Sequence, residues 1–161
     1  MVCAFTGHRP NRLPWGEREE DIHCQALKEM LARQLKQVLE QGCRHFLCGM
    51  AKGCDLYFAE LVLELKKADP GITLTAVLPY PGQADRWPES DRLRYHRILQ
   101  QCDRVQVLEP VYSDGCMLRR NRAMVDQAQM LISVWDGGRS GTGSTVRYAK
   151  EHGVTVIPMW V

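Results

Sequence analysis

Glycine and hydroxyl residues are concentrated between Asp136 and Ser144, in the segment Asp-Gly-Gly-Arg-Ser-Gly-Thr-Gly-Ser. Proteins hold phosphate groups with backbone amides and the positive end of a helix, and glycine lets the backbone approach closely. Because a helical pattern over 146–150 follows, this segment is the best candidate for a phosphate-binding loop. A flexible loop with an ordinary serine or threonine helix cap is the plainer interpretation. The candidate ligand residues are Asp136, Gly137, Gly138, Gly141, Thr142, Gly143 and Ser144.

A second glycine-bracketed turn runs from Gly49 to Asp55 and includes Ala51 and Gly53. The two glycines are expected to enclose a tight turn from a strand into a helix. Asp55 would then lie in the first helical turn, where the helix dipole favours a carboxylate. There it would accept hydrogen bonds from ribose hydroxyls, as acidic residues do in dinucleotide-binding folds. Simple helix capping explains this segment equally well.

A third candidate segment, Thr6-Gly7-His8-Arg9-Pro10, ends the first apolar run of the chain. The planar guanidinium of Arg9 is suited to clamping a phosphate or carboxylate with two hydrogen bonds. His8 would polarise a ligand oxygen or act as an acid or base, unless it is a loop histidine that is hydrogen-bonded to the backbone.

Aromatic side chains follow the third apolar run, in the loop that contains Pro79, Tyr80, Gln83 and Trp87. Tyr80 and Trp87 have planar rings on which a nucleotide base would stack. Packing at the edge of the core is the commoner role of single aromatic residues.

An amide, Asn121, shares one face of a predicted helix with apolar neighbours. A buried amide must find hydrogen-bond partners, so Asn121 is expected to tie loops together or to contact a ligand. The adjacent Arg119, Arg120 and Arg122 are interpreted as a solvated face of the same helix.

The elements that must position these residues alternate along the whole chain. Strands are expected over 2–6, 44–48, 72–78, 104–108, 130–135 and 154–159, and helices over 17–41, 53–68, 90–102, 117–129 and 144–152. In the first helix, Ile22, Leu27, Leu31, Leu35 and Val38 form an apolar stripe, and Ser90 or Glu89 is expected to cap the third. Such alternation predicts a single three-layer Rossmann-like α/β domain over residues 1–161, with a mostly parallel sheet flanked by helices. Ligands of such sheets bind outside the carboxyl ends of the strands.

Composition excludes several other classes of protein. The chain has 161 residues, 45% of them hydrophobic, and a formal net charge of +2, which is too small to indicate nucleic-acid binding. No apolar stretch is long enough to span a bilayer. Seven cysteines without a CxxC pair, and histidines without ligand spacing, indicate reduced thiols and no metal site. We therefore expect a cytoplasmic protein.

Together these motifs resemble the SLOG superfamily, in particular its small bacterial YpsA-like branch. The resemblance covers nearly the whole chain and depends on the order and spacing of the motifs. They are Thr6-Gly7-His8-Arg9-Pro10, Gly49-x-Ala51-x-Gly53-x-Asp55 with Glu60 beyond, Pro79-Tyr80 followed by Gln83 and Trp87, Arg94-Tyr95, Arg120-Asn121-x-x-Met124-Val125-Asp126, and Trp135-Asp136-Gly137 leading to Gly141-Thr142. The resemblance implies a Rossmann-like fold, a role in binding nucleotides or nucleotide-derived signals, and a homodimer.

Two relatives within that superfamily supply alternative functions. Lonely Guy phosphoribohydrolases carry a catalytic glutamate after a glycine-rich loop, but Thr145 stands at the matching position here. Asp55, Glu60 or Asp136 would have to replace that glutamate, and Asp55 and Glu60 are the candidate catalytic residues. DprA-type proteins share the turn at Gly49–Asp55 and bind single-stranded DNA. The YpsA-like branch usually has Gly-Gly-Thr where this chain has Ser140-Gly141-Thr142.

Three hypotheses follow from the sequence. The first is a binding or sensing protein for a nucleotide-like small molecule, with no certain cofactor, no membrane partner and no nucleic acid. The second is a hydrolase that cleaves the N-glycosidic bond of nucleoside monophosphates. The third is a single-stranded DNA-binding protein of the DprA type.

Overall fold

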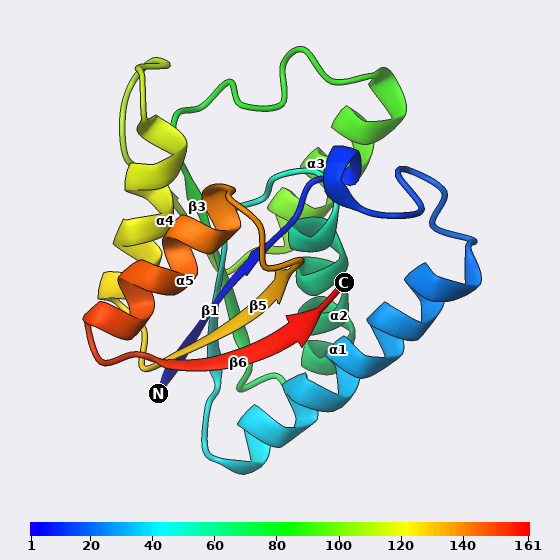
Figure 1. Ribbon diagram of the computed structural model, residues 1–161, viewed down its shortest axis with the longest axis vertical. Helices are drawn as coiled ribbons and strands as arrows, with labels where there is room; N and C mark the ends of the chain where they lie inside the picture. The colour runs from blue at the N-terminus through cyan, green and yellow to red at the C-terminus, as the bar shows by residue number, and fades with distance from the viewer.

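Six strands and five α-helices alternate in the computed structural model, which describes all 161 residues (Figure 1). The strands are β1 Val2–Gly7, β2 His45–Cys48, β3 Thr73–Leu78, β4 Arg104–Val107, β5 Met130–Trp135 and β6 Thr155–Trp160. The helices are α1 Ile22–Glu40, α2 Cys54–Ala68, α3 Glu89–Gln101, α4 Cys116–Asp126 and α5 Gly141–Glu151, with a short 3-10 helix, η1 Pro10–Arg12, after β1. The expected Rossmann-like α/β fold is confirmed.

All six strands are parallel and lie in the order β4-β3-β2-β1-β5-β6. In the middle of the sheet, Ala4 of β1 pairs with Leu47 of β2 on one side and with Leu131 of β5 on the other. The chain builds outward from β1 to β4, and then returns to the other side of β1 to add β5 and β6. The strand order therefore reverses between β1 and β5, which is where open α/β sheets bind their ligands.

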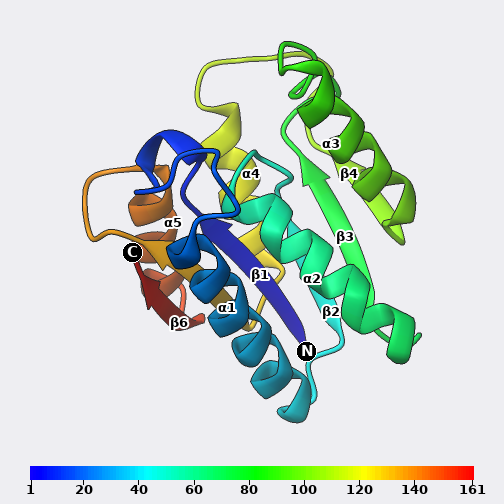
Figure 2. The same cartoon turned by 90° about the vertical axis from the view of Figure 1, so that its right-hand side faces the viewer.

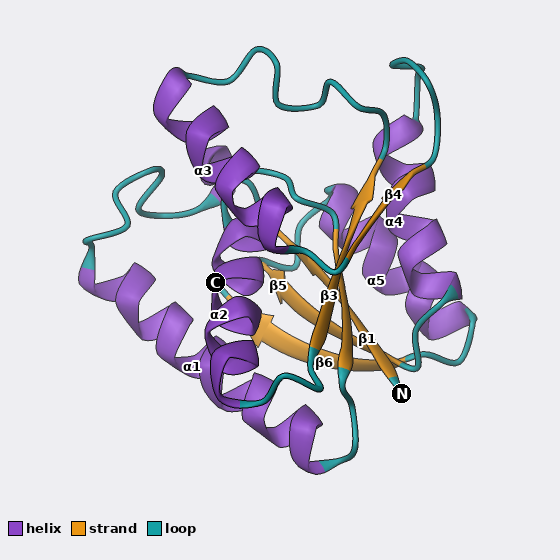
Figure 3. Cartoon of the chain, turned by 180° about the vertical axis from the view of Figure 1, so that it is seen from behind, coloured by secondary structure: helices purple, strands orange, loops and turns teal.

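Helices cover both faces of this sheet, as Figure 3 shows. Helices α1, α2 and α3 cover one face, with α1 and α2 side by side (Figure 2). The core on that face includes Phe5 and Phe58, whose rings stack with their centroids 4.6 Å apart. Helices α4 and α5 cover the other face, where Ala4, Leu47, Met124, Leu131 and Ala149 form a smaller cluster.

Helices α2, α3 and α4 begin within one residue of the expected positions, whereas α1 and α5 begin several residues away and α3 lacks the expected cap. Helix α1 begins at Ile22 rather than at position 17, because Asp21 caps it by accepting a hydrogen bond from the His23 amide at 2.8 Å. Ile22 lies outside the apolar stripe and is 76% exposed. Neither Ser90 nor Glu89 caps α3, since Pro88 occupies the cap position without a side-chain hydrogen bond.

The most consequential difference is at α5. This helix begins at Gly141, three residues before the expected start, and Ser140 is its cap. Gly141 and Gly143 lie in its first turn, although glycine disfavours helix interiors. The cap instead places the last part of the glycine-rich segment in the helix itself.

Two further expectations concern membranes and thiols. No helix of the structure is both long and apolar enough to cross a bilayer. All seven cysteines are free, and six of them are buried, as expected for reduced thiols within apolar patterns.

Candidate functional site

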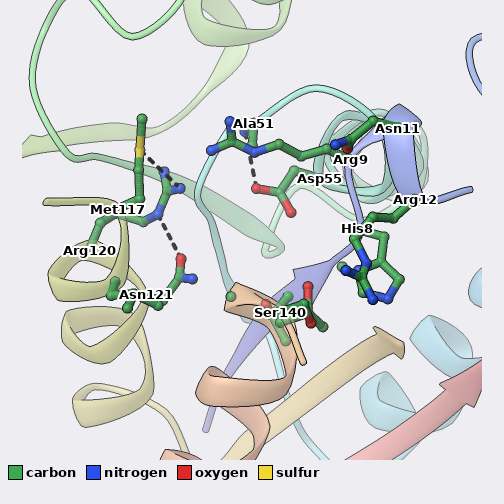
Figure 4. A pocket seen from close by; sticks show the side chains of 15 residues that line it. His8, Arg9, Asn11, Arg12, Ala51, Asp55, Met117, Arg120, Asn121 and Ser140 are labelled. Carbon is green, nitrogen blue, oxygen red and sulfur yellow. Dashed lines mark hydrogen bonds between the residues drawn. The ribbon is translucent and has the colours of Figure 1, made fainter. Parts of the chain in front are cut away.

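A cavity of about 300 Å³ lies at the carboxyl ends of β1 and β5, where the strand order reverses (Figure 4). It is polar, and it is enclosed by the segments that follow β1, β2 and β5 and by the start of α4. Its lining consists of Thr6, Gly7, His8, Arg9, Asn11, Arg12, Ala51, Asp55, Met117, Leu118, Arg120, Asn121, Ser140, Gly141 and Thr142. Loops far apart in sequence thus meet at the position that the fold favours for a ligand.

The start of α5 forms one wall of the cavity. The Ser140 hydroxyl accepts a hydrogen bond from the Gly143 amide at 3.0 Å, and the Ser140 carbonyl accepts one from the Ser144 amide at 3.0 Å. The amides of Gly141 and Thr142 have no acceptor within the chain, as is usual in the first turn of a helix. Two unpaired donors and the positive end of α5 therefore face the cavity.

The start of α2 forms a second wall, which carries Asp55. Its Oδ2 accepts a hydrogen bond from the Ala51 amide at 3.0 Å, whereas Oδ1 has no partner in the chain. Burial of the side chain, which is 6% exposed, raises the pKa of the Asp55 carboxyl, and the charges of Arg120 and Arg9 oppose that rise. Asp55 thus offers one free oxygen to a ligand.

Glycine at position 53 allows α2 to begin directly against the loop that follows β1. Gly53 has a φ of +88°, and a Cβ built on it would lie 2.8 Å from the His8 carbonyl oxygen. The same carbonyl accepts a hydrogen bond from the Cys54 amide at 3.2 Å. This close approach brings Arg9 and Asp55 to the same cavity.

Arg120 is a buried cation in the wall of the cavity and is only 2% exposed. Its guanidinium donates to the carbonyls of Gly49 and Val77 and, through Nε at 2.8 Å, to Asn121 Oδ1. A Cβ at Gly49 would lie 2.7 Å from the guanidinium carbon, so the glycine makes room for this arginine. None of the ion pairs of the chain includes Arg120, and burial lowers the pKa of its guanidinium.

The expectation of a solvated arginine face on α4 is therefore wrong for Arg120, although it holds for the exposed Arg119 and Arg122. Arg119 and Arg122 are exposed on the same helix, and the residue types alone do not distinguish the buried Arg120 from them. The available signal was helical spacing, because Arg120 lies four residues from both Cys116 and Met124, which are buried on the same helix.

Asn121 links α4 to α5 and is half-buried rather than buried. Its Nδ2 donates to the Thr145 hydroxyl at 3.0 Å, and that hydroxyl donates to the Gly141 carbonyl at 2.9 Å. Asn121 thus ties two helix starts together while it lines the cavity. Thr145, which stands at the position of the Lonely Guy glutamate, is buried in this network and does not line the cavity.

His8 holds the loop after β5 in place. Its Nε2 lies 3.0 Å from the Asp136 amide and 3.1 Å from Asp136 Oδ1. Burial lowers the pKa of His8, and the contact with Asp136 opposes that shift. The Asp136 amide donates to Nε2, a geometry that favours the neutral ring. The Gly138 amide, followed by Arg12, holds the pKa of Asp136 at about 2. Arg12 donates to Asp136 Oδ2 at 3.0 Å.

Several residues that the sequence singled out lie outside the cavity lining. Glu60 does not line the cavity that contains Asp55. It is paired with Arg94, and the distance between Arg94 Nε and Glu60 Oε1 is 3.2 Å. Gln83 supports the second turn by donating to the Gly49 carbonyl at 3.0 Å. Gly143 lies against Trp135, where a Cβ would be 2.9 Å from the indole. The other predicted residues outside the lining are Gly49, Gly53, Pro79, Trp87, Asp136, Gly137, Gly138 and Ser144.

Comparisons with known proteins show the family of the chain. A sequence profile described as the YspA SLOG family matches residues 3–153. A UPF0398 protein of Bacillus pumilus is 27% identical over 143 residues, which cover 88% of this chain and 76% of the relative. A UPF0398 protein of Halalkalibacterium halodurans is 30% identical over 120 residues, which cover 73% of this chain and 64% of the relative. The chain thus spans about two thirds to three quarters of these relatives.

Two solved structures share the fold. DNA processing protein A from Helicobacter pylori, studied for its single-stranded DNA binding mode, superposes with a TM-score of 0.65 at 16% identity, covering 98% of this chain and 64% of that one. DNA processing protein A from Streptococcus pneumoniae superposes with a TM-score of 0.61 at 19% identity, covering 98% of this chain and 49% of that one. At such identities the likeness concerns the fold alone.

Proposed function

Because the chain belongs to the YspA SLOG family, we propose that the cavity between β1 and β5 binds a nucleotide or a nucleotide-derived phosphate ligand. The observation that carries this proposal is the convergence of two helix starts, those of α2 and α5, with Arg9 and Arg120 on one polar cavity. Its position at the reversal of strand order supports the same conclusion.

The charges of the lining favour an anion. Three guanidinium groups, those of Arg9, Arg12 and Arg120, face the cavity, but Asp55 is its only carboxylate. Arg12 is paired with Asp136, whereas Arg9 and Arg120 take part in no ion pair. A buried cation without a direct ion pair is costly, and a bound phosphate would supply a partner in addition to the nearby charge of Asp55.

Each lining group has a role in this proposal. The free amides of Gly141 and Thr142 bind phosphate oxygens, and the dipole of α5 favours their charge. Arg9 and Arg120 neutralise the anion from two sides. The free Oδ1 of Asp55 accepts a hydrogen bond from a ribose hydroxyl. His8 positions the loop after β5 and needs no direct contact with the ligand.

Calorimetric titration with ribose 5-phosphate, inorganic pyrophosphate, AMP and ADP-ribose tests the proposal. We expect at least one of these probes to bind, and Arg120→Met to weaken it about 10- to 100-fold, because hydrogen bonds to charged groups contribute about 1.5–3 kcal/mol. Arg119→Met is the matched control, since Arg119 is exposed on the same helix and pairs with Glu109. Arg120→Lys retains the charge should the methionine variant unfold.

The outcomes separate the proposal from its rivals. Equal affinity of the Arg119→Met and Arg120→Met variants for a probe would show that the probe binds outside the cavity. If no probe binds to the wild type, the proposal is refuted. Binding only of single-stranded DNA, with affinity that falls steeply with salt, would favour the activity studied for the Helicobacter pylori protein.

An N-glycoside hydrolase is the second candidate, and Asp55 is the observation that favours it. Asp55 is the only carboxylate in the cavity, and its raised pKa suits a proton donor. Chromatography of the AMP titration mixture would reveal released adenine. Adenine release by the wild type that disappears in Asp55→Asn would establish catalysis. AMP that stays intact would show that the cavity binds its ligand without cleaving it.

A further inference from the structure

A second cavity, of about 500 Å³, adjoins the first on the far side of Arg9. It is lined by residues of the segment after β1 and of the loop that leads to α3. Arg9 and Asn11 line both cavities. The remaining lining residues of the second cavity are Pro10, Gly16, Glu17, Lys52 and Trp87.

Trp87 gives this second cavity its only aromatic surface. The indole is half-buried and lies edge-on to Tyr95, with the ring centroids 5.3 Å apart and the planes at 79°. Tyr95 is itself 1% exposed, so it belongs to the core and holds the indole in a fixed orientation. A pre-oriented aromatic ring at the edge of a cavity is suited to stacking a planar group.

Most of the residues that line the cavity with Trp87 have polar side chains. Lys52 Nζ lies 3.0 Å from Asp91 Oδ2 and also contacts Glu17, so its charge is neutralised within the chain. Glu17, Lys52 and Asn11 line the same cavity as the ring and supply both acceptors and donors. Such a wall fits a planar ring with polar edges, such as a nucleotide base, better than an aliphatic chain.

We propose that the cavity at Trp87 is the base subsite of a nucleoside phosphate whose phosphate occupies the main cavity. The inference rests on the proposed function and narrows its ligand class, a nucleotide or a nucleotide-derived phosphate, to ligands that keep an intact base. The base stacks on Trp87, and the ligand passes Arg9 and Asn11, which line both cavities. Arg9, which lines both cavities, then lies beside the phosphate end of the ligand.

The test compares ligands with and without a base in matched variants. Affinities of ribose 5-phosphate and of the four nucleoside 5′-monophosphates are measured by calorimetry for the wild type, Trp87→Ala and Trp87→Phe. Trp160→Ala is the control, because Trp160 is exposed and lines neither cavity. Circular dichroism checks that each variant folds, and quenching of tryptophan fluorescence gives a second readout in the wild type and in Trp87→Phe.

We expect the best nucleotide to bind about tenfold more tightly than ribose 5-phosphate in the wild type and in Trp160→Ala, as stacking on an aromatic ring predicts. Trp87→Ala abolishes that advantage, Trp87→Phe retains most of it, and quenching disappears in Trp87→Phe. If the advantage survives Trp87→Ala, or nucleotides quench both proteins equally, the base subsite is wrong while the phosphate site stands. If ribose 5-phosphate and every nucleotide fail to bind, the proposed function fails as well.

Discussion

At the scale of single residues, the cavity contains two buried groups of opposite charge that do not form an ion pair. Asp55 and Arg120 both line it, yet each is bonded to the backbone of the turn after β2, Asp55 to the Ala51 amide and Arg120 to the Gly49 carbonyl. A direct salt bridge would satisfy both charges and would close the space between them. Keeping them apart leaves both able to contact a ligand, at a cost to the stability of the unliganded protein.

This cost in stability leads to a prediction for the Asp55→Asn variant. The folded state raises the pKa of Asp55, so between the ordinary and the raised value the folded chain binds more protons than the unfolded chain. The free energy of unfolding therefore falls as pH rises through that window, and the loss is complete above it. Asparagine can still accept the Ala51 hydrogen bond without a charge. We expect Asp55→Asn to be more stable than the wild type at neutral pH and to bind ligand less tightly.

Urea unfolding across pH 4 to 8 measures this difference. The gap between Asp55→Asn and the wild type should widen with pH and then level off. Asp114→Asn is the control, since Asp114 is exposed and its side chain makes no hydrogen bond in the chain. A variant less stable than the wild type at neutral pH would show that the carboxylate is compensated within the protein.

At the scale of elements, the site depends on where helices begin. The alternating pattern predicted every strand and α-helix, although not the short η1, because buried parallel strands are short apolar runs and amphipathic helices have a distinct period. Helix starts were less predictable, because they depend on caps. Ser140 initiates α5 inside a glycine-rich run, and Asp21 delays α1.

Glycine at the start of α2 is the clearest requirement at this scale. At Gly53, a φ of +88° with a ψ of −129° is open essentially to glycine alone, and a Cβ would also collide with the His8 carbonyl. We expect Gly53→Ala to lower the free energy of unfolding by on the order of 3 kcal/mol. It should also weaken ligand binding, because the loop carrying Arg9 would move.

The matched control is Gly153→Ala. Gly153 also has a positive φ, +72°, but nothing lies within 4 Å of a Cβ built there. This variant should lose only about 1–2 kcal/mol and retain full affinity. Similar losses in the two variants, measured by urea unfolding, would mean that the approach of His8 to α2 contributes nothing beyond backbone strain.

At the scale of the whole molecule, the sequence predicted where the candidate site lies better than it predicted which residues line that site. Parallel α/β sheets bring post-strand loops to one edge, so Thr6–Arg9, Ala51, Asp55, Gly141 and Thr142 were expected to meet, and the structure brings them together. Arg120 was missed because its burial depends on how α4 packs against Gly49, a tertiary contact that spans 71 residues of sequence.

The same convergence predicts a global response to ligand. The cavity joins α2 on one face of the sheet to α4 and α5 on the other, so a ligand there contacts elements that separate when the chain unfolds. A ligand at 100 times its dissociation constant that binds only the folded state adds about 2.7 kcal/mol. For a chain of this size that is a rise of about 5–10 °C in Tm.

Scanning calorimetry should show this rise for the wild type and Arg119→Met at saturating ligand, and a much smaller rise for Arg120→Met at the same concentration. An equal rise in all three proteins would place the ligand outside the cavity, because removing the buried cation could not then leave its binding unchanged.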